Sequence, residues 1–468
     1  MVILLLFVVL TAVWWSVVWF VLPVDLAALA PPSLITLHVA PPVLTVFALL
    51  IGRQAWKWNA TRKENARDNE KKAQEAADLA AKAVAREAEL AARRAFIDCR
   101  AAWLAVPDEI PDWFMNESAQ CRILEQDADS LREMERDAAL SSSLQLVFEA
   151  ALLQCEALAY LPLYLFPGHD DSNIMAQALA CKAWQEALAR VFQDEKTLPP
   201  SDCRLLPNTD EPLPDRVLTL FENDPAMPAM WLLGVDSLLD KATDGAAEIK
   251  PGHAIAALIL SRPSLTLTEM DTIEKPDLSN PHLPHWEREQ GYKDAPQWGS
   301  VPPSHRKALW DLPPVAALHR SRTLSFGEQE RPRVKAQKLR EMVEAVLIDA
   351  TLRDPPPDTK ADEAKKAEEP EPLDLGYLFH NSGADDDPAT GKRSAFITAP
   401  LQDFDCPMSV DLAGNVFTEH GDTGAACPVL MLAEATMCAA QCELPVMVAE
   451  WEGADRLSIG IVRPATWT

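Results

Sequence analysis

The chain has 468 residues, which is long enough to bury a sizeable core and to form two or three domains. Its formal net charge of -27 repels phosphate backbones, so the composition excludes the usual nucleic-acid-binding proteins. Nine cysteines are scattered without CxxC pairs or a matching histidine spacing, and we therefore predict neither a zinc site nor a disulfide framework. Unpaired thiols in this number favour a reducing compartment.

Residues 1–57 predict a transmembrane hairpin. Residues 2–22 carry no charge, and about 20 apolar residues suffice to cross a bilayer. A second apolar stretch, residues 34–56, is interrupted by Pro41 and Pro42, which neighbouring helices can accommodate. A cleaved signal peptide is the alternative interpretation, but the first run is long and no basic residue precedes it.

The predicted orientation follows from the basic residues at the end of the second stretch. Arg53, Lys57, Arg62 and Lys63 lie there, and the positive-inside rule places this end in the cytoplasm. Both termini then face inward. If the second stretch is only interfacial, the topology inverts and the large domain lies outside, an alternative that the free thiols disfavour.

Residues 58–106 predict a charged helical stalk. The segment is rich in Ala, Glu, Lys and Arg and contains no proline or glycine, which gives it high helix propensity. Its apolar positions are mostly alanine, so a solvated helix is favoured over a coiled-coil zipper.

The rest of the chain predicts a globular body in two parts. Residues 107–353 show mixed helical and extended patterns, and residues 373–468 end in an alternating strand pattern at 457–462. Between them, residues 354–372 are dense in proline and charge, as in a linker. The chain contains no GxxxxGK[ST] or GxGxxG motif, so the two common nucleotide-binding signatures are missing.

Four segments resemble those of β-ketoacyl-synthase and thiolase-like proteins. They are WLLGVDSLLD at 231–240, PGHAIAALILSRP at 251–263, GDTGAACPVLMLAEATMCAA at 421–440 and LPVMVAEWEGADRLSIGIVRP at 444–464. The resemblance implies an α/β fold of five layers, α/β/α/β/α, built from two similar halves. Those halves would be residues 107–353 and 373–468.

The resemblance also implies a reaction site, from which this sequence departs. Such proteins place a cysteine at a helix N-terminus and add two histidines that stabilise a thioester oxygen and a carbanion. Here Asp422 stands at the position of the second histidine, where a carboxylate would repel a developing oxyanion. His420 lies two positions away, and His380 is a loose match for the first histidine. A membrane-tethered thiolase-like acyl-transfer enzyme is therefore the alternative rather than the preferred function.

No residue is predicted to be catalytic, to bind a cofactor or to bind a metal. Simple packing is favoured over a nucleophilic role for both Cys181, within a helical stretch, and Cys427, after the Gly-Ala-Ala turn. His282 and His285 are separated by a proline that prevents one helix face, and no third ligand completes a site. The carboxylate runs at 368–369 and 385–387 are interpreted as solvated.

The combination of membrane hairpin, charged stalk and degenerate body resembles a proteobacterial accessory family encoded beside lipase effectors of type VI secretion systems. The resemblance implies a non-catalytic adaptor at the inner membrane, with its large domain in the cytoplasm. Its implied partners are the lipase effector and the spike protein of the secretion apparatus. A structural membrane scaffold that self-associates through the stalk is a third hypothesis.

A partner surface is predicted on the proline- and tryptophan-rich segment 276–314. The chain has 14 tryptophans, and aromatic anchors are enriched at interface hot spots. Trp286, Trp298 and Trp310 are the candidate contacts in this segment. The alternative, that these rings pack on the body, stays open.

Overall fold

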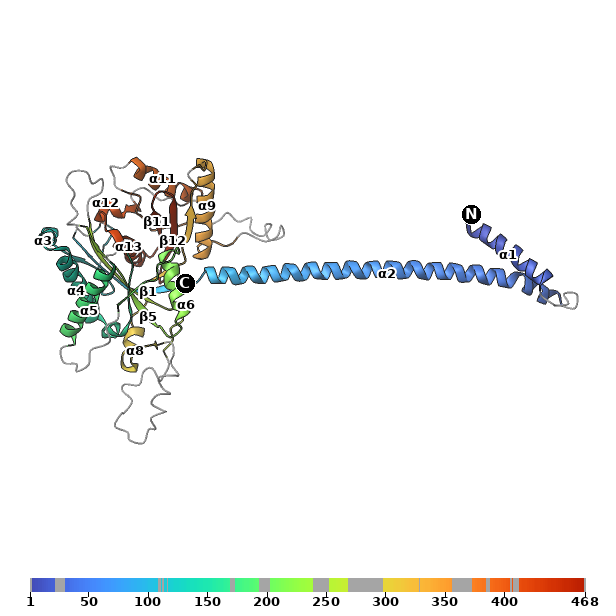
Figure 1. The fold of residues 1–468 in the computed structure, drawn as a ribbon, viewed down its shortest axis with the longest axis horizontal. Helices are drawn as coiled ribbons and strands as arrows, with labels where there is room; N and C mark the ends of the chain where they lie inside the picture. Colours follow the sequence, from blue (N-terminus) through green and yellow to red (C-terminus); the bar gives the residue numbers. More distant parts are fainter. Residues whose placement is uncertain are drawn as a thin grey trace, which may run out of the picture. The chain divides into compact units, whose positions relative to one another are not determined.

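The computed structural model describes most of the chain (Figure 1). The described residues are 2–21, 30–107, 111, 113–115, 117–168, 173–192, 203–238, 252–267, 298–327, 329–355, 373–383, 388–404, 406 and 412–466. They form two compact units, Met1–Glu89 and Leu90–Thr468.

The first unit contains two helices, α1 (Val2–Phe20) and most of α2 (Pro31–Arg93). The indole N–H of Trp14 donates a 2.8 Å hydrogen bond to the carbonyl oxygen of Leu37, so the two helices contact each other as in the predicted hairpin. By length and composition α2 can cross a membrane, and only 6% of its most apolar 18-residue stretch is buried. Within α1, residues Phe7–Phe20 form a shorter apolar helix. The structure thus contains apolar helices where the sequence predicts spans.

The second span and the stalk form one helix rather than two elements. Helix α2 runs through Pro41 and Pro42 and continues into the charged region. Its charged part is exposed along its length, as expected for a solvated helix rather than a zipper. The predicted stalk, 58–106, is too long at its C-terminal end: α2 ends at Arg93, and strand β1 (Phe96–Val106) follows.

Strand β1 forms because its apolar residues are buried on both faces. Ala102 and Leu104 belong to one hydrophobic cluster, whereas Ala101 and Trp103 belong to another. A run that is apolar on both faces is typical of a central strand. The helix predicted over residues 58–106 includes β1 because alanine and arginine continue to residue 102 without a helix breaker.

Among the described residues, the first half of the body contributes six strands to one mixed sheet, and five of them follow the order β4-β3-β5-β6-β1. Strands β4, β3 and β5 are parallel, whereas β5, β6 and β1 pair in antiparallel fashion, and a short strand β2 pairs in parallel with β1. The strands are β1, β2 (Cys121–Glu125), β3 (Leu163–Leu165), β4 (Cys203–Leu205), β5 (Ala229–Ser237) and β6 (His253–Ser261).

The second half repeats this arrangement. Its order is β10-β9-β11-β12, and β12 then pairs with β7 and β8. The first three are parallel and the remaining pairs are antiparallel, as in the first half. Antiparallel pairing of β1 with β7 joins the two halves. The strands are β7 (Ala316–His319), β8 (Arg322–Ser325), β9 (Tyr377–His380), β10 (Ala413–Asn415), β11 (Val446–Glu452) and β12 (Arg456–Pro464).

Helices occupy equivalent places in the two halves. In each half, one helix precedes each of the three parallel strands: β3, β4 and β5 in the first half, and β9, β10 and β11 in the second. In the first half these are α4 (Arg136–Gln154), α5 (Asn173–Val191) and α6 (Leu213–Asn223), and in the second α9 (Pro332–Asp349), α11 (Pro388–Gln402) and α13 (Cys427–Cys442). Short helices α3 (Ala128–Glu133), η2 (Glu156–Tyr160), α8 (Pro303–Trp310), α12 (Val416–His420) and η7 (Gly424–Ala426) fill the connections.

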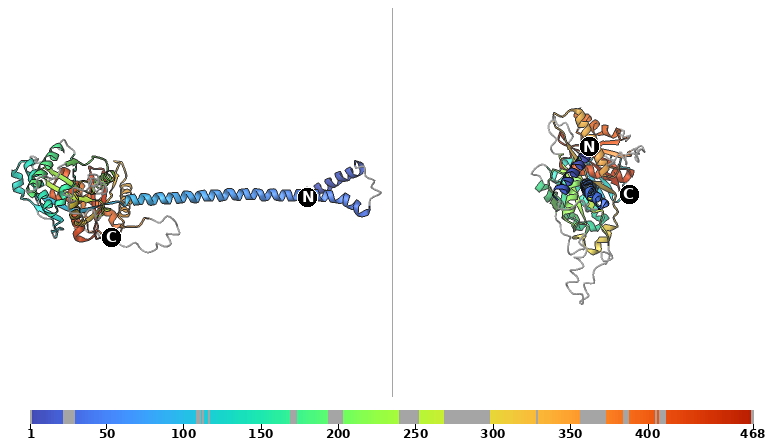
Figure 2. Two further views of the ribbon diagram at one scale, coloured as in Figure 1. Left: turned by 90° about the horizontal axis from the view of Figure 1, so that it is seen from below. Right: turned by 90° about the vertical axis from the view of Figure 1, so that its right-hand side faces the viewer.

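Three hydrophobic clusters separate five layers, which confirms the predicted α/β/α/β/α fold class. The central cluster contains α6 and α13 between the inner faces of the two half-sheets. The outer clusters pack α4 and α5 on the first half and α9 and α11 on the second. Figures 1 and 2 show α4 and α5 on the opposite side of the body from α9.

The boundary between the halves lies earlier than predicted. Strands β7 and β8 and helix α9 belong to the second half by their pairing and packing, although they precede residue 353. Composition pointed to the proline-rich linker as the boundary because a change of sheet partner leaves no compositional mark. Of that linker, residues 356–372 lie outside the described residues.

Candidate functional site

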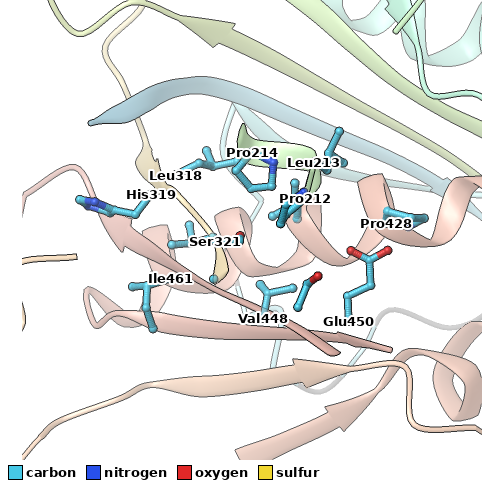
Figure 3. Close-up of a pocket in the computed structure, with 14 residues that line it drawn as sticks. Pro212, Leu213, Pro214, Leu318, His319, Ser321, Pro428, Val448, Glu450 and Ile461 are labelled. Carbon is cyan, nitrogen blue, oxygen red and sulfur yellow. The ribbon is translucent and has the colours of Figure 1, made fainter. Parts of the chain in front are cut away.

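The N-terminal ends of the two central helices converge, and this is the place where a helix-dipole site could form in this architecture. A cavity there is lined by Pro212, Leu213 and Pro214 at the start of α6 and by Pro428 at the start of α13. Figure 3 shows Glu450 reaching toward Pro428 from strand β11. The cavity measures about 20 Å³, which is room for about one water molecule. An acyl thioester does not fit this space.

The start of α6 is occupied by a structural ion-pair network. Asp215, in the first helical turn, is buried and accepts a 2.8 Å hydrogen bond from the backbone N–H of Ser321. Its carboxylate also pairs with Arg320 at 3.1 Å and with Arg93 at 3.7 Å. Burial raises the pKa of Asp215, and the two guanidinium groups oppose that effect. The sequence at this start is DEPLPD, with no cysteine.

The start of α13 carries Cys427, at the helix N-terminus that the sequence analysis suggested. The side chain is 5% exposed, and its sulfur lies 3.9 Å from the sulfur of Met431. Burial raises the pKa of the Cys427 thiol, and the neighbouring carboxylates of Glu450, Asp422 and Glu434 raise it further. Since the thiolate is the nucleophilic form, Cys427 is held in its unreactive form.

The backbone N–H groups that precede α13 are bound by the protein's own carboxylates. Asp422 accepts from the backbone N–H of Gly424 at 2.9 Å, and Asp236 of β5 accepts from that of Ala425 at 2.9 Å. Gly424 has a φ of +51°, and a Cβ there would lie 2.3 Å from the Asp236 carboxylate. These donors could otherwise hold an oxyanion. Asp422 and Asp236 therefore close this helix start from within the protein.

Arg136 of α4 fixes the Asp236 carboxylate in this position. Its guanidinium donates to Asp236 at 2.7 Å and to the carbonyl oxygen of Ser237 at 2.8 Å. Asp236 thus joins the outer helix layer to the central helix. Its role in the structure is to cap and to connect rather than to leave a free anion-binding pocket.

Each of the two histidines considered in the sequence has its own partners. His380, at the end of β9, has Nε2 3.3 Å from the hydroxyl oxygen of Ser394, and its Nδ1 accepts from the N–H of Ser382 at 3.4 Å. His420, at the end of α12, has Nε2 2.6 Å from the Oε1 of Glu434, and both side chains are buried. The proposed match of His380 to a thiolase histidine stays a prediction.

A cluster that the sequence analysis missed surrounds His420. Potential metal-ligand atoms of Glu419, His420 and Glu434 all lie within 4.8 Å of one another. Burial, followed by repulsion from Glu434, raises the pKa of Glu419 to about 7. The signal available in the sequence was Glu434 itself, a lone acidic residue inside the otherwise apolar helix CPVLMLAEATMC.

The other cysteines are structural or only moderately accessible. All nine lie among the described residues, and none forms a disulfide. Cys181 lies within helix α5, as predicted, and is half-buried. Cys442, at the end of α13, is also half-buried, and a hydrogen bond from Cys438 lowers the pKa of its thiol.

The three candidate partner-binding tryptophans have different environments. Trp298 is fully buried, and the guanidinium carbon of Arg306 lies 5.9 Å from its ring centre, so this ring packs on the body. Trp310, at the end of α8, is 38% exposed. Trp286 lies outside the described residues, as do His282, His285 and the acidic runs at 368–369 and 385–387. Partner binding stays a prediction, with Trp310 as its exposed candidate.

Comparison with solved structures finds thiolase-like enzymes over most of the chain. The peroxisomal 3-ketoacyl-CoA thiolase of Saccharomyces cerevisiae is 8% identical over 80% of this chain and 98% of its own, with a TM-score of 0.41; it is described as five-layered, with two core domains of identical topology. Human mitochondrial 3-ketoacyl-CoA thiolase is 7% identical over 80% of this chain and 99% of its own, with a TM-score of 0.40.

A third similar structure is 3-oxoacyl-[acyl-carrier-protein] synthase III from Aquifex aeolicus. It is 9% identical over 78% of this chain and 99% of its own, with a TM-score of 0.38. No family model and no curated protein matches the sequence. The fold class itself follows from the chain's own strand pairing and layers.

Proposed function

We propose that this protein is a non-catalytic, membrane-tethered adaptor that binds a partner protein. The observation that carries the proposal is the closed junction of the two central helices. Prolines and ion-paired Asp215 occupy the start of α6, and buried Cys427 occupies the start of α13. A fold that is used for chemistry elsewhere can serve as a rigid support once its site is filled.

The tether follows from the first unit. Apolar α1 and the apolar part of α2 suit a bacterial inner membrane, and the charged part of α2 leads to the body. Arg93, the last residue of α2, is bound to two carboxylates of the body, Asp215 and Asp349, at 3.7 and 3.3 Å. These contacts fix the last residues of α2 to the core of the second unit.

The specific partners that we propose are a lipase effector and the spike protein of a type VI secretion system. The resemblance of the whole architecture to the accessory family of such systems supports this assignment. The net charge of -27 also suits a partner with a basic surface, because complementary charges accelerate encounter. The large domain would then lie in the cytoplasm, where effector and spike are loaded.

Co-purification of the full-length protein in detergent with the spike protein and the lipase encoded beside it tests this function. We expect a complex of defined stoichiometry by size-exclusion chromatography with light scattering, and no change in lipase turnover on binding. Self-association without the lipase would support a structural scaffold instead and would contradict the adaptor role.

Substitution of Trp310 tests whether segment 276–314 is the surface that binds the partner. An exposed tryptophan at the centre of an interface commonly contributes about 2 kcal/mol or more, so Trp310→Ala should weaken lipase binding about 30-fold. Ile174→Ala, at an exposed apolar position on α5, is the matched control and should leave the affinity unchanged. Equal affinities for both variants and the wild type would remove segment 276–314 as the partner surface.

A further inference from the structure

Three ligating side chains meet in the interior of the second half, away from the junction of the central helices. Glu419 and His420 end helix α12, and Glu434 lies in the middle of α13. Their ligand atoms lie within 4.8 Å of one another, and the closest pair, His420 Nε2 and Glu434 Oε1, is 2.6 Å apart. His420 is 2% exposed and Glu434 is 0% exposed.

The cluster carries more negative charge than its protein partners neutralise. Among the described residues, no lysine or arginine forms an ion pair with Glu419 or Glu434, and the one ion-pair partner of Glu434 is His420. The second carboxylate oxygen of Glu434 is buried and has no hydrogen-bond partner among the described atoms. A buried carboxylate oxygen without a partner is costly, and a bound cation would satisfy it.

The ligand set indicates the class of cation. Calcium and magnesium prefer oxygen ligands alone, whereas an imidazole nitrogen with carboxylates suits zinc and similar first-row divalent ions. Zinc binds histidine nitrogen and carboxylate oxygen at about 2.0–2.2 Å. In tetrahedral coordination two ligand atoms of one zinc ion lie about 3.4 Å apart. The ligand atoms here all lie within 4.8 Å of one another, so the most distant pair approaches by up to about 1.4 Å when the side chains close around the ion.

We propose that Glu419, His420 and Glu434 bind one zinc-class divalent ion. The ion joins the end of α12 to the middle of α13 and so fixes the loop that leads to the start of the central helix. Two carboxylates and a neutral imidazole balance its double charge. The site is structural, because its ligands lie in the core rather than at a cavity large enough for a substrate.

Metal analysis of the full-length protein in detergent tests the proposal. The protein is equilibrated with zinc chloride, dialysed, and analysed by inductively coupled plasma mass spectrometry, and its affinity is measured by competition with a chromophoric chelator. We expect about one zinc ion per wild-type chain and binding at least tenfold weaker in Glu434→Gln and Glu419→Gln. Two controls should match the wild type: Glu450→Gln, a carboxylate outside the cluster, and Cys442→Ser, which removes a half-buried thiol.

A second measurement keeps the test decisive if Glu434→Gln fails to fold. Glu419 is less buried than Glu434, so Glu419→Gln leaves the interior His420–Glu434 pair in place. Zinc at a hundredfold excess over its Kd should raise the melting temperature of the wild type by a few degrees and that of Glu419→Gln by clearly less. A wild-type chain without bound zinc, or a Glu419→Gln variant that binds zinc as tightly as the wild type, would overturn the proposal.

Discussion

Helices α6 and α13 occupy equivalent places in the central layer but differ in length, burial and charge. Helix α6 is short and amphipathic, and Asp215 at its start is ion-paired with two arginines. Helix α13 is longer and buried from Cys427 to Ala439. By composition α13 also passes as a membrane span, but 72% of its apolar window is buried in the body.

The difference shows how equivalent positions in the two halves can serve two purposes. The start of α6 tolerates charge because Arg93 and Arg320 neutralise Asp215. At the start of α13, Cys427 stays protonated, and the carboxylates of Asp422 and Asp236 bind backbone N–H groups and Arg136. We infer that both halves hold the end of α2, through Asp215 of α6 and Asp349 of α9, while α13 supplies a rigid apolar core.

The largest effect is expected at Asp215. Asp215→Ala removes the acceptor for the Ser321 N–H and leaves Arg93 and Arg320 without this carboxylate. Breaking a buried pair costs about 3–5 kcal/mol, so the free energy of unfolding should fall by that amount in urea titrations. Asp129→Ala, at an exposed carboxylate, is the control and should change it by less than about 0.5 kcal/mol. Similar values for both would refute the anchoring role of α6.

The next effect concerns pH and the neutral environment beside α13. Burial lowers the pKa of His253 to about 4, although nearby Asp236 opposes the shift, and its Nε2 lies 2.9 Å from the Ser143 hydroxyl. The unfolded chain binds a proton near pH 6.5 and the folded chain does not, so stability is lost as the pH falls from about 6.5 to 4. The slope per histidine is about 1.4 kcal/mol per pH unit.

Substitution of His253 separates this contribution from general acid denaturation. His253→Gln keeps a polar contact for Ser143 but cannot titrate, so the loss of stability between pH 6.5 and 4 should be shallower than in the wild type. Urea titrations at several pH values measure the slope. An unchanged slope in the variant would show that His253 is not held neutral by the fold.

A smaller effect is expected where the first half-sheet meets α13. A Cβ on Gly234 of β5 would lie 2.6 Å from the Cβ of Val429 and 3.0 Å from the carbonyl oxygen of Ala426. Gly234→Ala should therefore lower the free energy of unfolding by about 1–3 kcal/mol through overpacking. Gly391→Ala, inside α11 with open space around it, should instead raise it by up to about 1 kcal/mol. If both variants behave alike, close packing of α13 on the sheet is wrong.

The sequence predicts the fold class well because its four resembling segments coincide with core elements. GVDS lies in β5, the segment around His253 forms β6, and the alternating run at 457–462 lies in β12. Each is defined by local pattern. The helix predicted over 58–106 failed at β1, since its apolar residues are alternately buried against two different helix layers, and local propensity does not report that.

Of the site, the sequence indicated the importance of Asp422 alone. The resemblance to thiolase-like segments predicts that it stands where a histidine is expected, and the structure shows that it binds the N–H of Gly424. The pairing of Arg93 with Asp349 joins residues 256 positions apart, and the cluster of His420 with Glu434 depends on burial. Neither spacing matches a known local motif, so both needed the three-dimensional structure.

The closed junction of the central helices is tested most directly by thioester reactivity. The full-length protein in detergent is incubated with a short-chain acyl-coenzyme A, and each cysteine-containing peptide is analysed by mass spectrometry. Labelling of Cys442 with iodoacetamide in a parallel sample confirms that the thiols are reduced. We predict that Cys427 carries no acyl group. An acyl adduct on Cys427 that disappears in Cys427→Ala would contradict the account.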